Sequence, residues 1–183
     1  MPTGPQRQTA RLLLGRVSAP GAVYFVTMCT SKRAQVLTLA HNLSSVRSTL
    51  ADTFSHDNSL HAACVMPDHV HLLFTLGKRL TVGQVMGKFK ASVRRRSDKL
   101  WTWQRNGFEH RLRETESEAD YAFYIFMNPY RAHLVPITTA WSGWLCEDPL
   151  RYRFLAGLKP DGTPPPEWLN YDKSIAAKID RSS

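Results

Sequence analysis

Two histidines, His69 and His71, stand two residues apart within a run of strand-forming residues. Side chains at positions i and i+2 of a β-strand point to the same face, roughly 6.6 Å apart along the backbone. Neutral imidazole rings at this spacing can converge on one divalent metal ion. The pattern is short, and the alternative interpretation is an ordinary, half-exposed histidine pair.

A second pair of chemically capable residues lies later in the chain. Tyr124 and Asn128 are four residues apart in a segment typical of a helix, so they share one face about one turn apart. A phenol nucleophile and a carbonyl ligand would then be neighbours. The alternative is a packed tyrosine and an asparagine that ends the helix before Pro129. Tyr121 and Tyr130 are rival phenols.

Hydrophobic spacing and turn residues predict the elements that must position these side chains. The predicted elements are a strand at 24–30, a helix at about 40–56, a hairpin of strands 60–66 and 69–76, a helix capped by Thr81, a strand at about 107–113, and a helix ending near Asn128. A capping box of Thr115 and Glu118 should open the last helix, and Pro129 should terminate it.

The first six of these elements follow the order β-α-β-β-α-β, which is the split βαβ plan of ferredoxin-like domains. We therefore expect an α+β fold with an antiparallel sheet, helices on one face of that sheet, and a further C-terminal helix that carries Tyr124. His69 and His71 would lie on the second strand of the hairpin.

The length and composition are those of one compact domain with appendages. Of the 183 residues, 43% are apolar and 21% are charged, which excludes wholesale disorder, collagen and disulfide-scaffold classes. We predict a basic N-terminal arm at 1–21, a main domain at 22–136 and a partly mobile extension at 137–183. Aromatic residues between 141 and 155 predict a terminal helix in that extension, and residues 162–166 are typical of a linker.

The net charge of +9 is concentrated in one segment. Residues 78–113 contain eleven basic and two acidic side chains, an excess equal to the net charge of the whole chain. One alternative is a solvated basic face of the helix that begins after Thr81. The density of charge instead favours contact with the phosphates of a nucleic acid.

Cysteine usage and hydropathy bear on the cellular compartment. Cys29, Cys64 and Cys146 are far apart and form no C-x-x-C pair, so neither a disulfide framework nor a zinc knuckle is predicted. We find no signal-peptide pattern and no apolar stretch of the ~20 residues that a membrane helix needs. We expect a cytoplasmic, nucleoid-associated protein with no membrane partner.

Four segments resemble, in this order, the single-tyrosine HUH transposases, and among them the REP-associated tyrosine transposases. They are Met66 to Leu73 (MPDHVHLL), Trp103-Gln104, Glu109 to Arg113 (EHRLR) and Tyr124 to Val135 (YIFMNPYRAHLV). The opening Pro20 to Thr27 (PGAVYFVT) is also similar, so the likeness covers about residues 20–135.

This resemblance implies an enzyme that cleaves and rejoins single-stranded DNA with a tyrosine nucleophile and a Mg²⁺ or Mn²⁺ ion. Carried over by position, His69 and His71 are the paired metal ligands, Asn128 is the third ligand and Tyr124 is the nucleophile. The implied products are a 5′-phosphotyrosine bond and a free 3′-hydroxyl. Relatives include dimers that exchange the tyrosine helix and monomers that act in cis, so a monomer and a homodimer both remain open.

The expected partner is single-stranded or hairpin DNA. We predict that basic residues of the central segment follow the DNA backbone, whereas Gln104, His110 and Arg113 match positions that recur in the family and are placed near the DNA. Trp101 and Trp103 could stack on unpaired bases or pack in the core. The remaining predicted contacts are Lys90, Arg94, Arg95 and Arg96, together with Arg7 and Arg11 in the arm.

Two positions depart from the family pattern: Tyr130 replaces a small aliphatic residue, and His133 replaces a glycine. Two other functions compete with the transposase. One is a non-catalytic hairpin DNA- or RNA-binding protein on the same fold, which the four intact candidate residues argue against. The other is a metal-dependent phosphodiesterase in which water attacks and Tyr124 only packs.

Overall fold

A computed structural model describes residues 18–148 and 150–182, in which five strands form one antiparallel sheet. The order across the sheet is β4-β1-β3-β2-β5, so the first strand lies in the interior between the third and the fourth. The strands are β1 (Val23–Cys29), β2 (Ser59–Val65), β3 (His69–Thr75), β4 (Phe108–Arg111) and β5 (Trp144–Leu145). The predicted ferredoxin-like α+β fold is confirmed.

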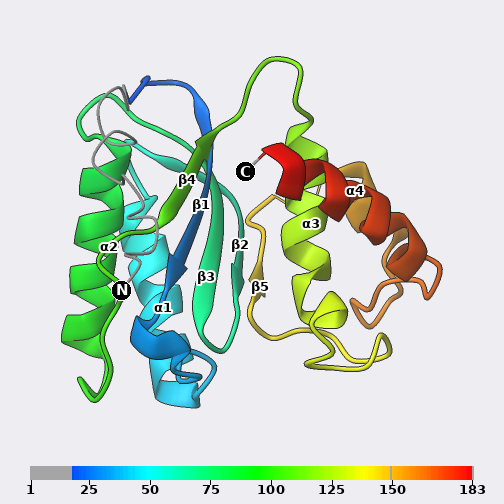
Figure 1. The fold of residues 1–183 in the computed structure, drawn as a ribbon, viewed down its shortest axis with the longest axis horizontal. Helices are drawn as coiled ribbons and strands as arrows, with labels where there is room; N and C mark the ends of the chain where they lie inside the picture. Colours follow the sequence, from blue (N-terminus) through cyan, green and yellow to red (C-terminus); the bar gives the residue numbers. More distant parts are fainter. Residues whose placement is uncertain (1–17, 149, 183) are drawn as a thin grey trace, which may run out of the picture.

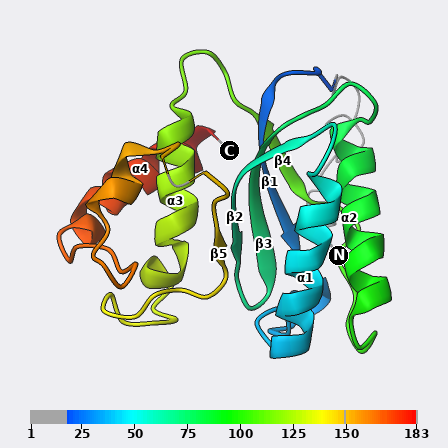
Figure 2. The same cartoon turned by 180° about the vertical axis from the view of Figure 1, so that it is seen from behind.

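Helices cover both faces of this sheet (Figures 1 and 2). One face carries the first two helices, and the other is covered by the third helix, against which the fourth packs (Figure 1). They are α1 (Ala40–Thr53), α2 (Val82–Arg96), α3 (Glu118–Arg131) and α4 (Trp168–Ser182), and short 3-10 helices span Ser31–Arg33 and Arg153–Gly157. The predicted helix carrying Tyr124 is therefore α3, opposite α1 and α2.

Alternation along the strands builds a separate core on each face. In β3, Val70 and Leu72 are buried among the residues that pack with α1 and α2, whereas Leu73 belongs to the cluster around α3. Because side chains two apart share a face, His69 and His71 lie on the same side as Leu73 and face α3. In β1, Phe25 belongs to that same α3 cluster, so Thr27 and Cys29 also face α3.

The start of α2 follows the sequence prediction, whereas the start of α3 differs from it. Thr81 caps α2 in a capping box with Gln84. At α3 the cap is Ser117, whose Oγ accepts from the Asp120 amide at 3.2 Å. Thr115 cannot form the predicted capping box, because the Glu118 carboxylate accepts a hydrogen bond from the Tyr152 hydroxyl instead.

Helix α3 also continues past Pro129, where the sequence predicted its end. Proline lacks an N–H and removes one helical hydrogen bond. The next amides nevertheless close the turn, because Ala132 N donates to Asn128 O at 2.9 Å and His133 N donates to Tyr130 O at 3.1 Å. This additional turn extends the helix to Arg131.

The predicted terminal helix between 141 and 155 is wrong. Trp144 instead lies in the edge strand β5 and pairs with Cys64 of β2, so the backbone is extended there, and Phe154 lies in the second 3-10 helix. Their rings pack on Phe126 of α3 at centroid distances of 5.2 and 5.6 Å. The aromatic residues are thus spaced to cover α3 and not to form one helical face. The terminal helix is α4.

A polar cluster ties this C-terminal segment to the first turn of α3. The Glu118 carboxylate accepts from Arg151 Nε at 2.9 Å and from the Tyr152 hydroxyl at 2.7 Å, and its Oε1 lies 3.0 Å from His61 Nδ1. Burial raises the pKa of Glu118, but the hydrogen bonds from His61, Arg151 and Tyr152 outweigh it and lower the pKa to about 2.

We expect Glu118→Gln to lower the free energy of unfolding at pH 7 by about 1–3 kcal/mol, the cost of losing hydrogen bonds to a charged group. Because the folded-state pKa of Glu118 lies below the unfolded value of 4.5, the carboxylate stabilises the fold above that pH and this contribution is lost as the pH falls toward 2. Urea unfolding at pH 7 and pH 3 measures the difference, with the exposed Glu114→Gln as control. An equal loss at both pH values would contradict the assignment.

No helix within residues 18–148 and 150–182 is both long and apolar enough to cross a membrane. The division into arm, main domain and extension stays a prediction, and Arg7 and Arg11 lie outside the described residues.

Candidate active site

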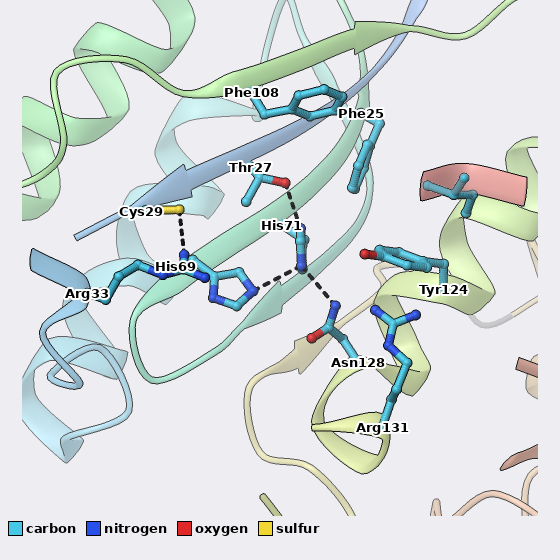
Figure 3. A pocket seen from close by; sticks show the side chains of 11 residues that line it. Phe25, Thr27, Cys29, Arg33, His69, His71, Phe108, Tyr124, Asn128 and Arg131 are labelled. Carbon is cyan, nitrogen blue, oxygen red and sulfur yellow. Dashed lines mark hydrogen bonds between the residues drawn. The ribbon is translucent and has the colours of Figure 1, made fainter. Parts of the chain in front are cut away.

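The two histidines of β3 converge on one point. Their positions are fixed by the pairing of β3 with β1, in which His71 lies opposite Thr27 and His69 lies opposite Cys29. The Nε2 atoms of the two rings are 3.0 Å apart (Figure 3). His71 is buried and His69 is half-buried. The shared strand face predicted from sequence is therefore present.

Each histidine uses its Nδ1 atom for a partner within the protein. His69 Nδ1 lies 2.6 Å from Asp68 Oδ1, and His71 Nδ1 lies 2.9 Å from the Thr27 hydroxyl. Such partners orient an imidazole ring and leave its Nε2 lone pair for a metal. Thr27 carried no predicted role, although the alternation of β1 places it on the histidine face and could have indicated it.

Burial favours the neutral form of both imidazoles, because it lowers the pKa of each ring. Burial lowers the pKa of His69, partly opposed by the hydrogen bond and charge of Asp68. Burial lowers the pKa of His71 further, and the neighbouring His69, Arg131 and Arg33 add to this effect. A neutral imidazole is the form that can donate an electron pair to a cation.

Helix α3 brings Asn128 and Tyr124 to this histidine pair. Asn128 Nδ2 is 3.0 Å from His71 Nε2, and the side chain is buried. The Tyr124 ring contacts the rings of His71 and Phe25 edge-on, each at a centroid distance of 6.0 Å. The Tyr124 hydroxyl points toward His71 (Figure 3). The helical spacing of four residues thus presents both side chains to one site.

These side chains line a cavity of about 440 Å³. Its walls come from β1, β3, β4, the first 3-10 helix, α3 and α4. The lining residues are Phe25, Thr27, Cys29, Arg33, His69, His71, Phe108, Tyr124, Asn128, Arg131 and Ile179. Neither Tyr121 nor Tyr130 is among them.

The two rival phenols are buried elsewhere. The Tyr121 hydroxyl donates to Glu116 at 3.1 Å, and burial together with the charge of Glu116 raises its pKa strongly. Tyr130 is 2% exposed, burial raises its pKa, and its hydroxyl has no hydrogen-bond partner in the described structure. Only Tyr124 of the three is half-exposed and opens into the cavity.

The donor atoms fit a divalent cation. Two nitrogens 3.0 Å apart can both lie about 2.1 Å from one ion with roughly a right angle between them, as octahedral coordination requires. A half turn of the Asn128 amide would present its Oδ1 as a third donor. The described residues hold no cluster of three or more His, Cys, Asp or Glu that could bind a metal, and the third donor at this site would be an amide.

Two arginines to which the sequence assigned no role, Arg33 and Arg131, also line the cavity. Arg33 comes from the first 3-10 helix, where it and Lys32 have φ near +55°. Its Nε lies 2.9 Å from Asp68 Oδ2, and its Nη1 donates to Cys29 Sγ at 2.8 Å. The guanidinium carbon of Arg131 lies 4.1 Å from the centroid of the Tyr124 ring. No local pattern predicts Arg33, because a loop conformation brings it to the site.

The basic residues predicted to bind DNA lie outside this cavity. Lys90 donates to the Gln104 carbonyl at 2.9 Å, Arg94 packs over Trp101 at 5.6 Å, and Arg96 pairs with Asp52 at 2.5 Å. Arg95 is exposed. Three of these four predicted DNA contacts on α2 are therefore engaged in contacts within the chain.

Two of the later predicted DNA residues, Gln104 and His110, are next to residues that line the cavity. The backbone N–H of Gln104 donates to the backbone carbonyl of Cys29 at 2.8 Å, which places Gln104 next to a residue that lines the cavity. His110 lies opposite Phe25 in the sheet, where its Nε2 is 2.9 Å from Glu116. Arg113 is exposed just after β4. Trp101 is buried and cannot stack on a base, whereas Trp103 is half-buried.

The departure at His133 has a conformational basis. His133 follows the end of α3 with φ at +55°. A residue in this left-handed conformation after a helix is usually glycine, since glycine has no Cβ to clash there. The histidine therefore occupies a position that favours glycine, and it is exposed, away from the cavity.

The sequence pattern of one protein family, described as "Transposase IS200 like", matches residues 19–127. That match spans more than half of the chain and includes His69, His71 and Tyr124, ending one residue before Asn128. The chain belongs to this IS200-like transposase family, a family of enzymes.

The resemblance to REP-associated tyrosine transposases is also confirmed. A Haemophilus influenzae protein assigned as a REP-associated tyrosine transposase is 25% identical over 137 residues, which cover 66% of this chain and 77% of that protein. A solved structure, described as a REP-associated tyrosine transposase bound to a REP hairpin, matches with a TM-score of 0.62 and 22% identity. It covers 70% of this chain and 79% of that one. This structural match shows that the two proteins share a fold.

Proposed function

We propose that this transposase is a metal-dependent endonuclease and strand-transferase that acts on single-stranded DNA at palindromic repeat hairpins. The observation that carries the proposal is the cavity in which the half-exposed Tyr124 phenol meets the His69 and His71 imidazoles. A nucleophile and a neutral metal-ligand pair are the two parts that a covalent phosphoryl transfer needs.

In the proposed reaction Tyr124 Oη attacks the scissile phosphorus. The Oη–P bond forms while the bond from phosphorus to the 3′ oxygen breaks, which leaves a 5′-phosphotyrosine and a free 3′-hydroxyl. The phenol gives up one proton and the 3′ oxygen gains one, with water carrying the proton between them. Because the ester retains the bond energy, a DNA 3′-hydroxyl can later displace Tyr124 without ATP.

His69, His71 and Asn128 would hold the Mg²⁺ or Mn²⁺ ion. When bound, that ion polarises the phosphate and stabilises negative charge on phosphorus and the attacking oxygen. Asp68 and Thr27 keep the two rings oriented for this role through the Nδ1 contacts at 2.6 and 2.9 Å. Phe25 and His71 hold the Tyr124 ring so that its hydroxyl remains in the cavity.

Tyr124 packs against His71 of its own chain, which is the arrangement that action in cis requires. The proposed DNA partner rests on the REP hairpin held by the solved relative and on the excess of positive charge at 78–113. Among the predicted contacts, Arg95, Gln104 and Arg113 are exposed and are the best placed to meet a phosphate backbone.

The decisive experiment incubates purified protein with labelled hairpin oligonucleotides from repeats that flank its gene, with Mn²⁺, with Mg²⁺ or with EDTA. We expect a metal-dependent protein–DNA adduct on a denaturing gel. Cleavage without an adduct would favour hydrolysis by water. DNA that is retarded on a native gel but never cut would favour the binding-only function.

We expect Asp68→Ala to weaken Mn²⁺ binding by about 10–100-fold, the usual effect of removing a partner that orients a ligating histidine. Asp68→Asn should retain much of the affinity, because its amide oxygen can still accept from His69 Nδ1. Calorimetric titration with Mn²⁺ measures both values. Equal binding by wild type and Asp68→Ala would show that Asp68 serves only its ion pair with Arg33.

A further inference from the structure

Arg131 lies beside the proposed nucleophile and has no assigned role. It follows Tyr124 by seven residues and Asn128 by three, so all three side chains lie along one face of α3. Its guanidinium carbon is 4.1 Å from the centroid of the Tyr124 ring, and its side chain lines the same cavity as His71. Figure 3 shows the guanidinium next to both Tyr124 and Asn128.

A ring contact and an ion pair hold this guanidinium in place. A cation over an aromatic face within about 6 Å is attracted by the ring. The buried Asp172 of α4 forms an ion pair with this guanidinium, with Oδ2 at 3.8 Å from Arg131 Nη1. This exceeds hydrogen-bond length, and Nη1 is buried without a hydrogen bond in the described structure.

Arg33, the other arginine of the cavity, has closer partners within the chain. Arg33 is committed to Asp68 at 2.9 Å and to Cys29 at 2.8 Å. Because Nη1 of Arg131 is buried beside the Asp172 carboxylate, it is the rest of the guanidinium, on a side chain 29% exposed at the cavity, that can meet a ligand. Arg131 therefore offers guanidinium donors to the cavity beside the Tyr124 ring, whereas the Arg33 guanidinium is bonded to Asp68 and Cys29.

We propose that Arg131 is a catalytic residue that binds the non-bridging oxygens of the scissile phosphate while Tyr124 attacks it. The inference rests on the function proposed above for this cavity. The planar guanidinium offers two parallel N–H donors that match two phosphate oxygens, and it keeps its protons throughout the step. Negative charge grows on those oxygens as the Oη–P bond forms, so the contact strengthens as the reaction proceeds.

Two measurements on Arg131→Met test this role. The first is the single-turnover rate of adduct formation with a flanking-repeat hairpin that carries a single-stranded tail. We expect a fall of about 10²–10³-fold, as when one donor to a developing charge is removed. Arg131→Lys should recover part of the rate. Arg153→Met, which removes an exposed arginine of the C-terminal segment outside the cavity, should react like wild type.

The second measurement is DNA affinity in EDTA in the Tyr124→Phe background, which retains the ring under Arg131 and prevents attack. Arg131→Met should weaken binding of the tailed hairpin by about tenfold, as for one charged hydrogen bond. Binding of the stem alone should not change. A loss of folding would affect both oligonucleotides equally, and Arg131→Gln then replaces the methionine variant.

The outcomes separate this inference from the proposed function. A wild-type rate and an unchanged tail affinity in Arg131→Met would overturn the role of Arg131 while the covalent chemistry stands. If wild type forms no adduct but the tail affinity still depends on Arg131, the phosphate contact stands and the covalent chemistry fails. No adduct and no dependence on Arg131 would overturn both.

Discussion

Tyr124→Phe will form no detectable covalent adduct, and its rate of DNA cleavage will fall by about 10⁴-fold or more, in the range seen when an enzyme loses its nucleophile. The change removes only the hydroxyl. The ring that packs on Phe25 and His71 and beneath Arg131 is retained. We therefore expect the variant to bind hairpin DNA with unchanged affinity, which a native gel in EDTA measures.

The matched control is Tyr130→Phe. The Tyr130 hydroxyl is buried without a hydrogen-bond partner in the described structure, so its removal relieves a desolvated polar group and should leave the protein as stable or more stable. Adduct formation should equal that of wild type. An adduct that persists in Tyr124→Phe and disappears in Tyr130→Phe would move the nucleophile to Tyr130. Metal-dependent cutting that survives Tyr124→Phe would instead assign the attack to water.

His69→Ala is expected to cause the next largest fall in the rate of adduct formation. It removes one of two nitrogens that lie 3.0 Å apart at the proposed metal position. Electrostatic stabilisation by a bound metal typically contributes several kcal/mol to a phosphoryl transfer. The rate of adduct formation at fixed Mn²⁺ should therefore fall by about 10³-fold or more. Calorimetric titration should show a parallel loss of Mn²⁺ binding.

Two controls test whether the fall in rate of His69→Ala comes from the loss of a metal ligand. His41→Ala removes an exposed imidazole on α1, outside the cavity, and should leave rate and Mn²⁺ affinity unchanged. The affinity of His69→Ala for hairpin DNA in EDTA should match wild type, because the ring is offered to the metal and not to the DNA. Undiminished adduct formation in His69→Ala would remove this histidine from the metal site.

Local patterns were sufficient for the pairs of candidate residues and for the order of the elements. The strand period of two places His69 and His71 on one face, and the helical period places Tyr124 and Asn128 on another. These periods depend only on backbone geometry within one element. The element order in turn favours one antiparallel topology, so the ferredoxin-like sheet followed from sequence.

The boundaries of α3 show where local rules failed. Glu118 was predicted to complete a capping box, but its carboxylate binds Arg151 and Tyr152 from the C-terminal segment. Contacts with distant residues compete with local capping and can outweigh it. Pro129 was predicted to end the helix, yet the next amides close another turn and carry Arg131 to the Tyr124 face.

The sequence by itself therefore determined which side chains share a strand or helix face, and through element order it determined the fold. Only the tertiary structure decided that Tyr124 opens into the cavity while Tyr121 and Tyr130 are buried elsewhere, that Thr27 meets His71, and that Arg96 is paired with Asp52. The physical reason is that backbone periodicity directs side chains within one element. Sheet register and packing between segments far apart in the chain decide which of those side chains meet.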